Sequence, residues 1–213
     1  MNTARQLHWD MVYREKTEAQ TSWYRAHLDE SLRLIDALGL PPDAPLLDVG
    51  GGRATLVDDL LARGFRDVSV LDLSQIALAE AQRRLGADAG KVRWIAGDVS
   101  EVELPAAHYA LWHDRAVFHF LINAIERERY VSALVRAVRV GGHAVIATFA
   151  PDGPERCSGL PVCRYGEIEL AAEFALAFEQ VGASRHVHVT PAGSEQPFTH
   201  VVLRRRADAG TIE

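Results

Sequence analysis

Short apolar runs alternate along the chain with longer stretches whose apolar residues recur every three or four positions. The runs have the length of buried strands, and the stretches between them have the periodicity of helices packed on one face. Strands are predicted at 46–49, 67–71, 91–95, 109–113 and 143–149, and helices at 54–61, 75–85 and 126–138. This alternation indicates an α/β fold of Rossmann-like type, with a twisted, mostly parallel sheet and helices on both faces.

The last part of the chain changes to an antiparallel pattern. A helix is predicted at 167–178, and two apolar segments, 184–189 and 198–203, lie on either side of turn residues. Segments joined in this way form an antiparallel hairpin, which brings the predicted sheet to about seven strands. His186 and His188 share one face of the first segment, because side chains alternate along a strand. We interpret them as part of a solvated strand face rather than as a metal-binding pair.

The first forty residues differ from the rest in being rich in aromatic side chains. Residues 5–24 contain Trp9, Tyr13, Trp23 and Tyr24, which either pack a helix on the body of the protein or form a lid over a ligand pocket. Apolar spacing predicts a further helix at 31–38. We therefore expect an N-terminal helical lid over 1–40, a core over 41–206 and a flexible tail over 207–213.

Composition narrows the function classes. The 213 residues are 48% hydrophobic and 24% charged, an ordinary balance for a folded protein. The net charge of −6, without a basic block, argues against a nucleic-acid partner. No apolar run approaches the roughly 20 residues of a membrane helix, and the first residues lack the apolar core of a secretory signal. Two cysteines provide no disulfide framework, so we expect a cytoplasmic protein with neither membrane contact nor metal.

The first predicted strand runs into a glycine turn, and the helix at 54–61 follows it. Gly50, Gly51 and Gly52 allow a tight turn whose backbone N–H groups approach a polar ligand. The turn departs from the dinucleotide pattern G-x-G-x-x-G, because Thr55 stands at the position of its last glycine. Asp48 at the end of the strand would repel a pyrophosphate. A ligand that carries positive charge therefore fits this turn better than NAD does.

Acidic residues follow the next two predicted strands. Asp72 lies 24 positions after Asp48, where folds of this kind hold the two hydroxyls of a ribose. Ser74 can cap the following helix, which leaves Asp72 available to a ligand. Asp98 either makes a turn or accepts a hydrogen bond from an exocyclic amine such as that of adenine. The presence of Asp48 and Asp72 favours the ligand interpretation.

The end of the fourth predicted strand concentrates chemically active side chains: His113, Asp114, Arg115, Phe118 and His119. Ligands of open α/β sheets bind outside the carboxyl ends of the strands, so these residues should border the pocket. The structural alternative is a capping Asp114 with Arg115 as its ion-pair partner. We expect that alternative to explain part of the role of Asp114, but neither Arg115 nor His119.

The alternating fold, the closing hairpin and three strand-end carboxylates together resemble the class I S-adenosylmethionine-dependent methyltransferases. The segment LLDVGGG resembles the glycine motif of that family, with Ala54 where many members have a third glycine. The resemblance implies that Gly50 and Gly52 border the methionine end of S-adenosylmethionine, with Asp48 close by. It also implies that Asp72 binds the ribose and Asp98 the adenine. The product would be S-adenosylhomocysteine.

The segments HWDMVYREK, WHDRAVFHF, ERERY and GEIELAAEF are similar in order and character to thiopurine methyltransferase-like and tellurite-resistance methyltransferases. This second resemblance implies that Trp9 and Trp23 line the cofactor site and that Arg115 lies by the substrate. The expected cofactor-binding residues are Trp9, Trp23, Asp48, Gly50, Gly51, Gly52, Asp72, Leu73, Asp98, Val99 and His113.

Methyl transfer from a sulfonium is an in-line displacement, to which positioning can contribute roughly 7–11 kcal/mol. We predict that Arg115 lowers the pKa of an acceptor thiol, that His119 is a base or orienting group, and that Asp114 belongs to the same catalytic set. Phe118, Cys157 and Cys163 are the candidate substrate residues. The cysteines are either incidental or a soft-ligand pair for a thiophilic substrate such as a metalloid.

The predicted function is methyl transfer to a small molecule, at a thiol or another soft nucleophile, by a monomer or weak homodimer. A protein lysine methyltransferase is one alternative, because small enzymes of this class with a similar Asp-Arg turn after the fourth strand modify lysines. The other alternative is an S-adenosylmethionine-binding protein without transferase activity.

Overall fold

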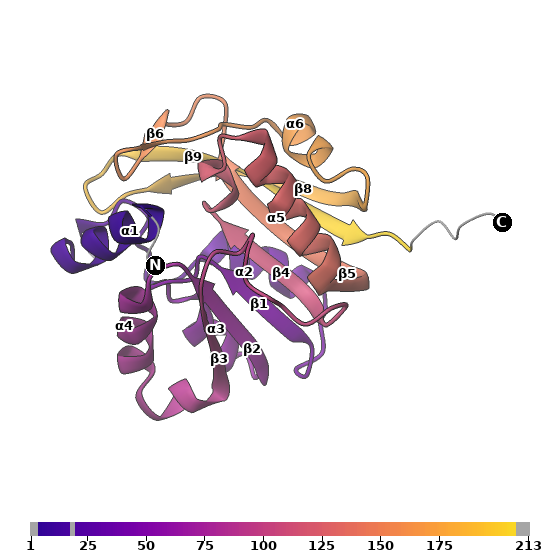
Figure 1. Cartoon of the computed structure of the whole chain (residues 1–213), viewed down its shortest axis with the longest axis horizontal. Coiled ribbons are helices and arrows are strands. Elements are labelled where there is room, and N and C mark those ends of the chain that lie inside the picture. The colour runs from indigo at the N-terminus through magenta and orange to yellow at the C-terminus, as the bar shows by residue number, and fades with distance from the viewer. Residues whose placement is uncertain (1–3, 18–19, 208–213) are drawn as a thin grey trace.

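The computed structural model describes residues 4–17 and 20–207. Within these ranges the centre of the molecule is a seven-stranded sheet of order β3-β2-β1-β4-β5-β9-β8 (Figure 1). The parallel strands are β1 (Pro45–Val49), β2 (Asp67–Asp72), β3 (Val92–Ala96), β4 (Tyr109–Arg115) and β5 (Val138–Phe149). The hairpin of β8 (Phe178–Val189) and β9 (Glu195–Arg205) adds to β5 in antiparallel orientation. The predicted Rossmann-like fold is confirmed.

Helices cover both faces of this sheet. One face carries α2 (Asp29–Ala37), α3 (Leu56–Ala62) and α4 (Gln75–Leu85), and the other carries α5 (Ala124–Ala137) and α6 (Glu167–Ala172). Helix α1 (Ala4–Glu15) lies beside α4 at one end of the sheet (Figure 1). The short elements are η2 (Gly86–Lys91), η3 (Phe118–Phe120), β6 (Arg156–Cys157) and β7 (Leu160–Pro161).

Alternation along the strands divides the hydrophobic core in two. Leu47 and Val49 of β1 belong to the core beneath α5 and α6, whereas Leu46 belongs to the core beneath α2, α3 and α4. The strands are apolar on both faces for this reason, as parallel strands in α/β proteins are. Asp48 shares the face of Leu46, because side chains two positions apart lie on the same side of a strand.

The largest differences from the predicted boundaries lie at the start of β5 and between α6 and β8. Strand β5 begins at Val138 and includes Gly141 and Gly142, because Val138 already pairs with Tyr109 of β4. Helix α6 ends at Ala172, six residues before the predicted end, and strand β8 begins at Phe178, which pairs with Arg205. In β5, pairing with β4 begins at the predicted end of the helix, whereas turn residues 173–177 separate α6 from β8.

The region predicted as a lid over 1–40 contains two parts with different packing. Helix α2 packs Leu32, Leu34 and Ile35 into the core beneath α3, so it is part of the body of the protein. Residues 4–17 and 20–28, here called the N-terminal segment, contain the parts that reach the pocket described below. Of the predicted tail, residues 208–213 lie outside the described residues. No described helix is long and apolar enough to cross a membrane.

Candidate functional site

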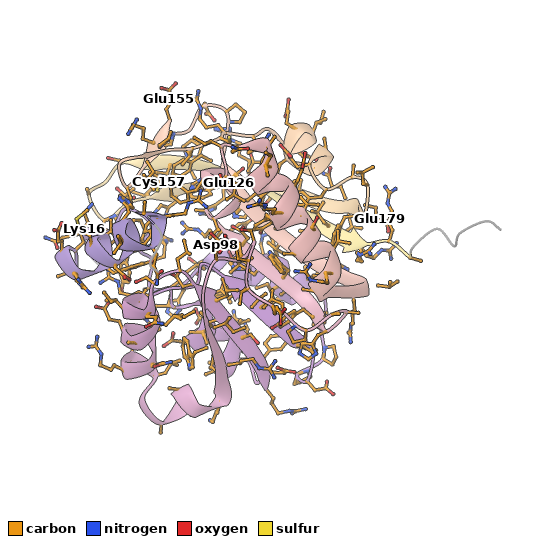
Figure 2. All side chains as sticks on the ribbon, in the orientation of Figure 1. Lys16, Asp98, Glu126, Glu155, Cys157 and Glu179 are labelled. Atoms are coloured by element: carbon orange, nitrogen blue, oxygen red, sulfur yellow. The ribbon has the colours of Figure 1, made fainter. Side chains whose placement is uncertain are left out.

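The main pocket lies at the carboxyl ends of the central parallel strands. Strands β1 and β4 are neighbours in the sheet. The loop after β1 leads to α3 on one face, and the loop after β4 leads to α5 on the other, so a crevice opens between the two loops. The pocket is lined by residues that follow each of these strands and β3, together with the N-terminal segment and Cys157. Figure 2 shows Asp98 and Cys157 near this end of the sheet. From the sheet, its lining includes Asp48, Gly50, Gly51, Asp72, Leu73, Asp98, Val99, His113, Arg115 and Val117.

The glycine turn needs its glycines for conformation and for space. Gly50 and Gly52 have φ angles of 68° and 43°, which side-chain-bearing residues rarely adopt. A Cβ atom on Gly51 would lie 2.5 Å from Asp48 Oδ2, and one on Gly52 would lie 2.6 Å from the Tyr13 hydroxyl. Gly50 and Gly51 line the pocket, whereas Gly52 stands behind it against Tyr13.

Three carboxylates line the pocket, and each is held by a different set of donors. Asp48 Oδ1 lies 2.7 Å from His113 Nδ1. Asp72 Oδ1 accepts the backbone N–H of Ser74 at 2.8 Å. Asp98 Oδ1 accepts the backbone N–H and hydroxyl of Ser100 at 2.9 and 2.7 Å. All three carboxylates line the pocket wall, as the sequence predicted.

Asp72 is the carboxylate most affected by burial. Loss of hydration raises its pKa to about 7, and the charge of Asp48 adds to this effect, while the N–H groups of Ser74 and Gly52 oppose it. A carboxylate in this environment is stabilised by further hydrogen-bond donors. A ribose diol supplies two such donors.

The carboxylate acceptors of the pocket fit S-adenosylmethionine. Its ribose hydroxyls and adenine amine are hydrogen-bond donors, and its ammonium and sulfonium groups are cationic, so both kinds of group suit Asp48, Asp72 and Asp98. The apolar remainder of the ligand suits Val99 and the aromatic side chains of the N-terminal segment, which line the same pocket. The pocket is thus chemically matched to this cofactor.

The N-terminal segment covers the pocket and is tied to the glycine turn. Trp9, Tyr13, Trp23 and Tyr24 all line the pocket, and Trp9 contacts Tyr13, Trp23 and Phe120 edge to face or tilted. Arg53, directly after Gly52, donates two hydrogen bonds of 2.9 Å to the Lys16 carbonyl. Its guanidinium also stacks 4.9 Å from the Tyr13 ring centroid. The aromatic residues therefore have the positions expected of a cover.

Arg115 is the cationic side chain at the end of β4. It is partly buried, donates to the Trp23 carbonyl at 3.2 Å, and lies 4.8 Å above the ring of Phe198. No carboxylate pairs with it among the residues the structure describes. Burial lowers its pKa to about 10, so the guanidinium remains charged at neutral pH. Within the part of the chain that the structure describes, the pocket thus contains a positive charge that forms no ion pair with a carboxylate.

The structure places Asp114 away from the pocket. Along β4, His113 and Arg115 share one face, and Asp114 points to the opposite face. There it is fully buried, accepts the Tyr130 hydroxyl at 2.5 Å and accepts the N–H of Val117 at 2.8 Å. Burial raises its pKa to about 6. The assignment of Asp114 to the catalytic set is therefore corrected: Asp114 holds the turn that carries Arg115.

Phe118 and His119 also lie outside the pocket lining. Phe118 is fully buried against Tyr130, Tyr165 and Phe174. His119 is fully buried between Phe120 and Phe149, and burial together with the charge of Arg115 lowers its pKa to about 3. A neutral imidazole enclosed in this way has no path to an acceptor. The geometry supports neither the substrate role predicted for Phe118 nor the base role predicted for His119.

The two cysteines do not converge on one site. Cys157 lines the pocket, and burial raises its pKa to about 11, so it is a neutral thiol. Cys163 is half-buried, packs against the core beneath α5 and donates its N–H to the His119 carbonyl. No group of three metal-ligating side chains occurs in the described ranges. This arrangement does not support the soft-ligand pair.

Several residues of the site were not identified from the sequence. Phe120 and Arg25 line the main pocket, and Ser31 contacts His113. Tyr24, which the sequence offered only as part of the aromatic cluster of a possible lid, also lines the pocket. His188, expected on a solvated face, is instead buried, and its Nε2 lies 2.6 Å from the Ser22 carbonyl.

Buried histidines should make the protein sensitive to acid. Burial lowers the pKa of His119 and His200 to about 3 and that of His188 to about 4, so below pH 6.5 the unfolded chain takes up protons that the folded protein cannot. The raised pKa values of Asp72 and Asp114 have the opposite effect, because these two carboxyl groups bind protons in the folded protein before they do so in the unfolded chain. Three histidines act against these two carboxyl groups, so the net effect of acid is to destabilise the folded protein. Thermal unfolding without ligand should show a falling midpoint from pH 6 to 4.5. A constant or rising midpoint would contradict the prediction.

Comparison with known proteins agrees with this fold. Residues 46–142 match the family model described as a methyltransferase domain. The chain is 24% identical over 186 residues to the human EEF1A lysine methyltransferase 2, covering 81% of this chain and 73% of that protein. It is 20% identical over 151 residues to the eEF1A lysine and N-terminal methyltransferase of Mus musculus, covering 67% of this chain. This chain spans only 21% of the length of that mouse protein.

Two solved structures cover nearly the whole chain. One, described as converting a disulfide bond into a thioacetal group during echinomycin biosynthesis, superposes with a TM-score of 0.79 at 18% identity, covering 97% of this chain and 95% of its own. The other is 1,6-didemethyltoxoflavin-N1-methyltransferase of Burkholderia thailandensis, with its substrate and S-adenosylhomocysteine bound. It has a TM-score of 0.70 at 24% identity, with coverages of 96% and 89%. Residues 46–142 thus match a methyltransferase domain, these solved structures share the fold of nearly the whole chain, and the pocket suits S-adenosylmethionine as cofactor.

Proposed function

We propose that the protein methylates a small molecule at a thiolate or another soft, anionic nucleophile. The observation that carries this proposal is Arg115, a charged side chain in the pocket without a carboxylate partner among the described residues. A cation whose charge is not compensated by the protein favours an anionic ligand. The acceptor is therefore expected to bring the negative charge.

Arg115 would also prepare the acceptor for reaction. S-adenosylmethionine, when bound, supplies a methyl group on a sulfonium sulfur. A thiol has an ordinary pKa of about 8.5, and a neighbouring cation lowers it, so more of the acceptor is thiolate at neutral pH. The N-terminal segment covers the pocket with Trp9 and Trp23 and limits the access of water. The role of these residues would be to align and desolvate the acceptor.

Protein lysine methylation remains the second candidate, because the curated relatives described above are lysine methyltransferases at 20–24% identity. A lysine side chain arrives as an ammonium ion and must lose a proton before it reacts. Arg115, with Arg25 in the same lining, would repel that ammonium. The covered pocket and the positive charge of Arg115 at the end of β4 therefore support the small molecule over the lysine.

A methyl-transfer assay with labelled S-adenosylmethionine tests this proposal. It compares small thiols, selenite, tellurite and arsenite with a whole-cell protein extract as acceptors. Label in a small, soluble or volatile product is the expected result, and it would identify the acceptor atom. Label in a protein band would replace the proposal with the lysine function, and cofactor binding without any transfer would favour a protein that only binds the cofactor.

A further inference from the structure

A buried chain of hydrogen bonds leads from helix α2 to the wall of the main pocket. His113 Nδ1 lies 2.7 Å from Asp48 Oδ1, and His113 Nε2 lies 2.9 Å from Ser31 Oγ. Exposure of Ser31, His113 and Asp48 is 1%, 2% and 4%. The three residues therefore form a buried Ser–His–Asp series of hydrogen bonds, in which Asp48 and His113 border the main pocket and Ser31 borders a smaller neighbouring one.

Sheet geometry brings Asp48 and His113 together. β1 and β4 are adjacent parallel strands, and these two residues are register partners, so their side chains leave the sheet on the same face. Helix α2 covers that face, and Ser31 is one of its buried residues. The contact between His113 and Ser31 spans 82 positions of sequence, which is why the linear pattern did not reveal it.

The arrangement uses all the polar atoms of the imidazole. When His113 is neutral, its Nδ1–H donates to Asp48 and its Nε2 accepts the hydroxyl of Ser31. Asp48 is then held in one orientation by this 2.7 Å hydrogen bond. Its second oxygen lies over the glycine turn, where a Cβ on Gly51 would be only 2.5 Å from it.

We propose that His113 is a positioning residue for the cofactor, which orients the charged Asp48 carboxylate toward the cationic amino-acid end of the ligand. Ser31 fixes the imidazole ring from the opposite side. His113 therefore acts through Asp48, and its contribution depends on the amino-acid group of the ligand. The adenosine end, beside Asp72 and Asp98, would gain no binding energy from the Ser31–His113–Asp48 hydrogen bonds.

Two ligands that differ at that group test the proposal. S-adenosylhomocysteine has the amino-acid end, and 5′-methylthioadenosine has the same thioether-linked adenosine without it. In His113→Leu, calorimetry should show about 10-fold weaker binding of S-adenosylhomocysteine, the loss typical of one charge-assisted hydrogen bond, with less than about 2-fold change for 5′-methylthioadenosine. His113→Asn, whose amide can donate where Nδ1 donates, should recover most of the lost affinity.

Two further variants keep the test decisive. Ser31→Ala removes only the hydrogen bond between Ser31 and His113 Nε2. It should weaken the binding of S-adenosylhomocysteine by about 3-fold and leave the binding of 5′-methylthioadenosine unchanged. His200→Leu, which removes another buried imidazole with an unpartnered Nδ1 in the described structure, is the matched control and should change neither affinity. Thermal unfolding of each variant reports on folding.

Three results would overturn the proposal. Equal losses for both ligands would mean that His113 only supports the fold, and unchanged affinities in His113→Leu and Ser31→Ala would mean that the chain has no role in binding. A wild-type protein that binds neither ligand would refute the cofactor assignment, and this proposal with it. If His113→Leu does not fold, the selective loss in Ser31→Ala and the intermediate affinity of His113→Asn carry the test.

Discussion

Replacing Arg115 with methionine is expected to lower kcat for the methyl acceptor by about 100-fold, while the affinity for S-adenosylhomocysteine changes by less than about 3-fold. A hydrogen bond to a charged group contributes about 1.5–3 kcal/mol, which corresponds to roughly 10- to 150-fold. Methionine preserves much of the length and apolar contact of the side chain, so the loss measures the charge. Steady-state kinetics and calorimetry on the same preparations provide the two values.

The control for charge is Arg115→Lys. It keeps the positive charge but lacks the planar guanidinium that stacks on Phe198 and reaches the Trp23 carbonyl. Activity between that of wild type and Arg115→Met is expected. Equal losses of turnover and cofactor affinity in Arg115→Met would show that Arg115 belongs to the cofactor site. Full activity in that variant would remove the main support for an anionic acceptor.

Replacing Asp72 with alanine is expected to weaken the binding of S-adenosylhomocysteine by about 100-fold or more. The carboxylate lines the pocket at the end of β2, and two hydroxyls of one ribose can donate to it. Two hydrogen bonds to a charged acceptor, each at the lower limit of about 1.5 kcal/mol, together account for this loss. Calorimetric titration at pH 8, above the raised pKa of Asp72, measures the charged form.

Two variants of the same strand control for folding. Asp72→Asn retains the shape and can still accept the Ser74 N–H, so it should fold and bind with intermediate affinity. Without ligand its stability should also fall more steeply than that of wild type when the pH falls from 8 to 6. The reason is that Asp72 of the folded protein takes up a proton near pH 7, whereas in the unfolded chain it does so near pH 4, so wild type has a stabilising contribution that Asp72→Asn lacks. Asp67→Asn, at the opposite end of β2, should leave binding unchanged. Unaltered binding in Asp72→Ala would refute the ribose site.

Local pattern determined most of the fold. The apolar runs at β1, β2, β3 and β4 and the amphipathic stretches between them have different periods, so strands and helices could be distinguished before any tertiary contact was known. The largest boundary errors were at the start of β5, where long-range pairing with β4 begins at Val138, and at the end of α6, where turns at 173–177 lead into β8.

The sequence also located the cofactor side of the site. Asp48, Asp72 and Asp98 each lie at or just after the end of a parallel strand, and parallel strands bring their carboxyl ends to the same edge of a sheet. Their convergence on one pocket follows from topology, without knowledge of side-chain contacts.

Only the tertiary structure decided the roles of the residues around β4. The segment YALWHDR is buried on both faces, so its apolar pattern does not show which side chains face the pocket. Packing against α5 turned Asp114 toward Tyr130 and away from Arg115, and the turn after the strand enclosed His119. Packing of α2 on the opposite face brought Ser31 to His113. Helices and strands are specified largely by nearby residues, whereas these pairings depend on which distant helix covers which face of the sheet.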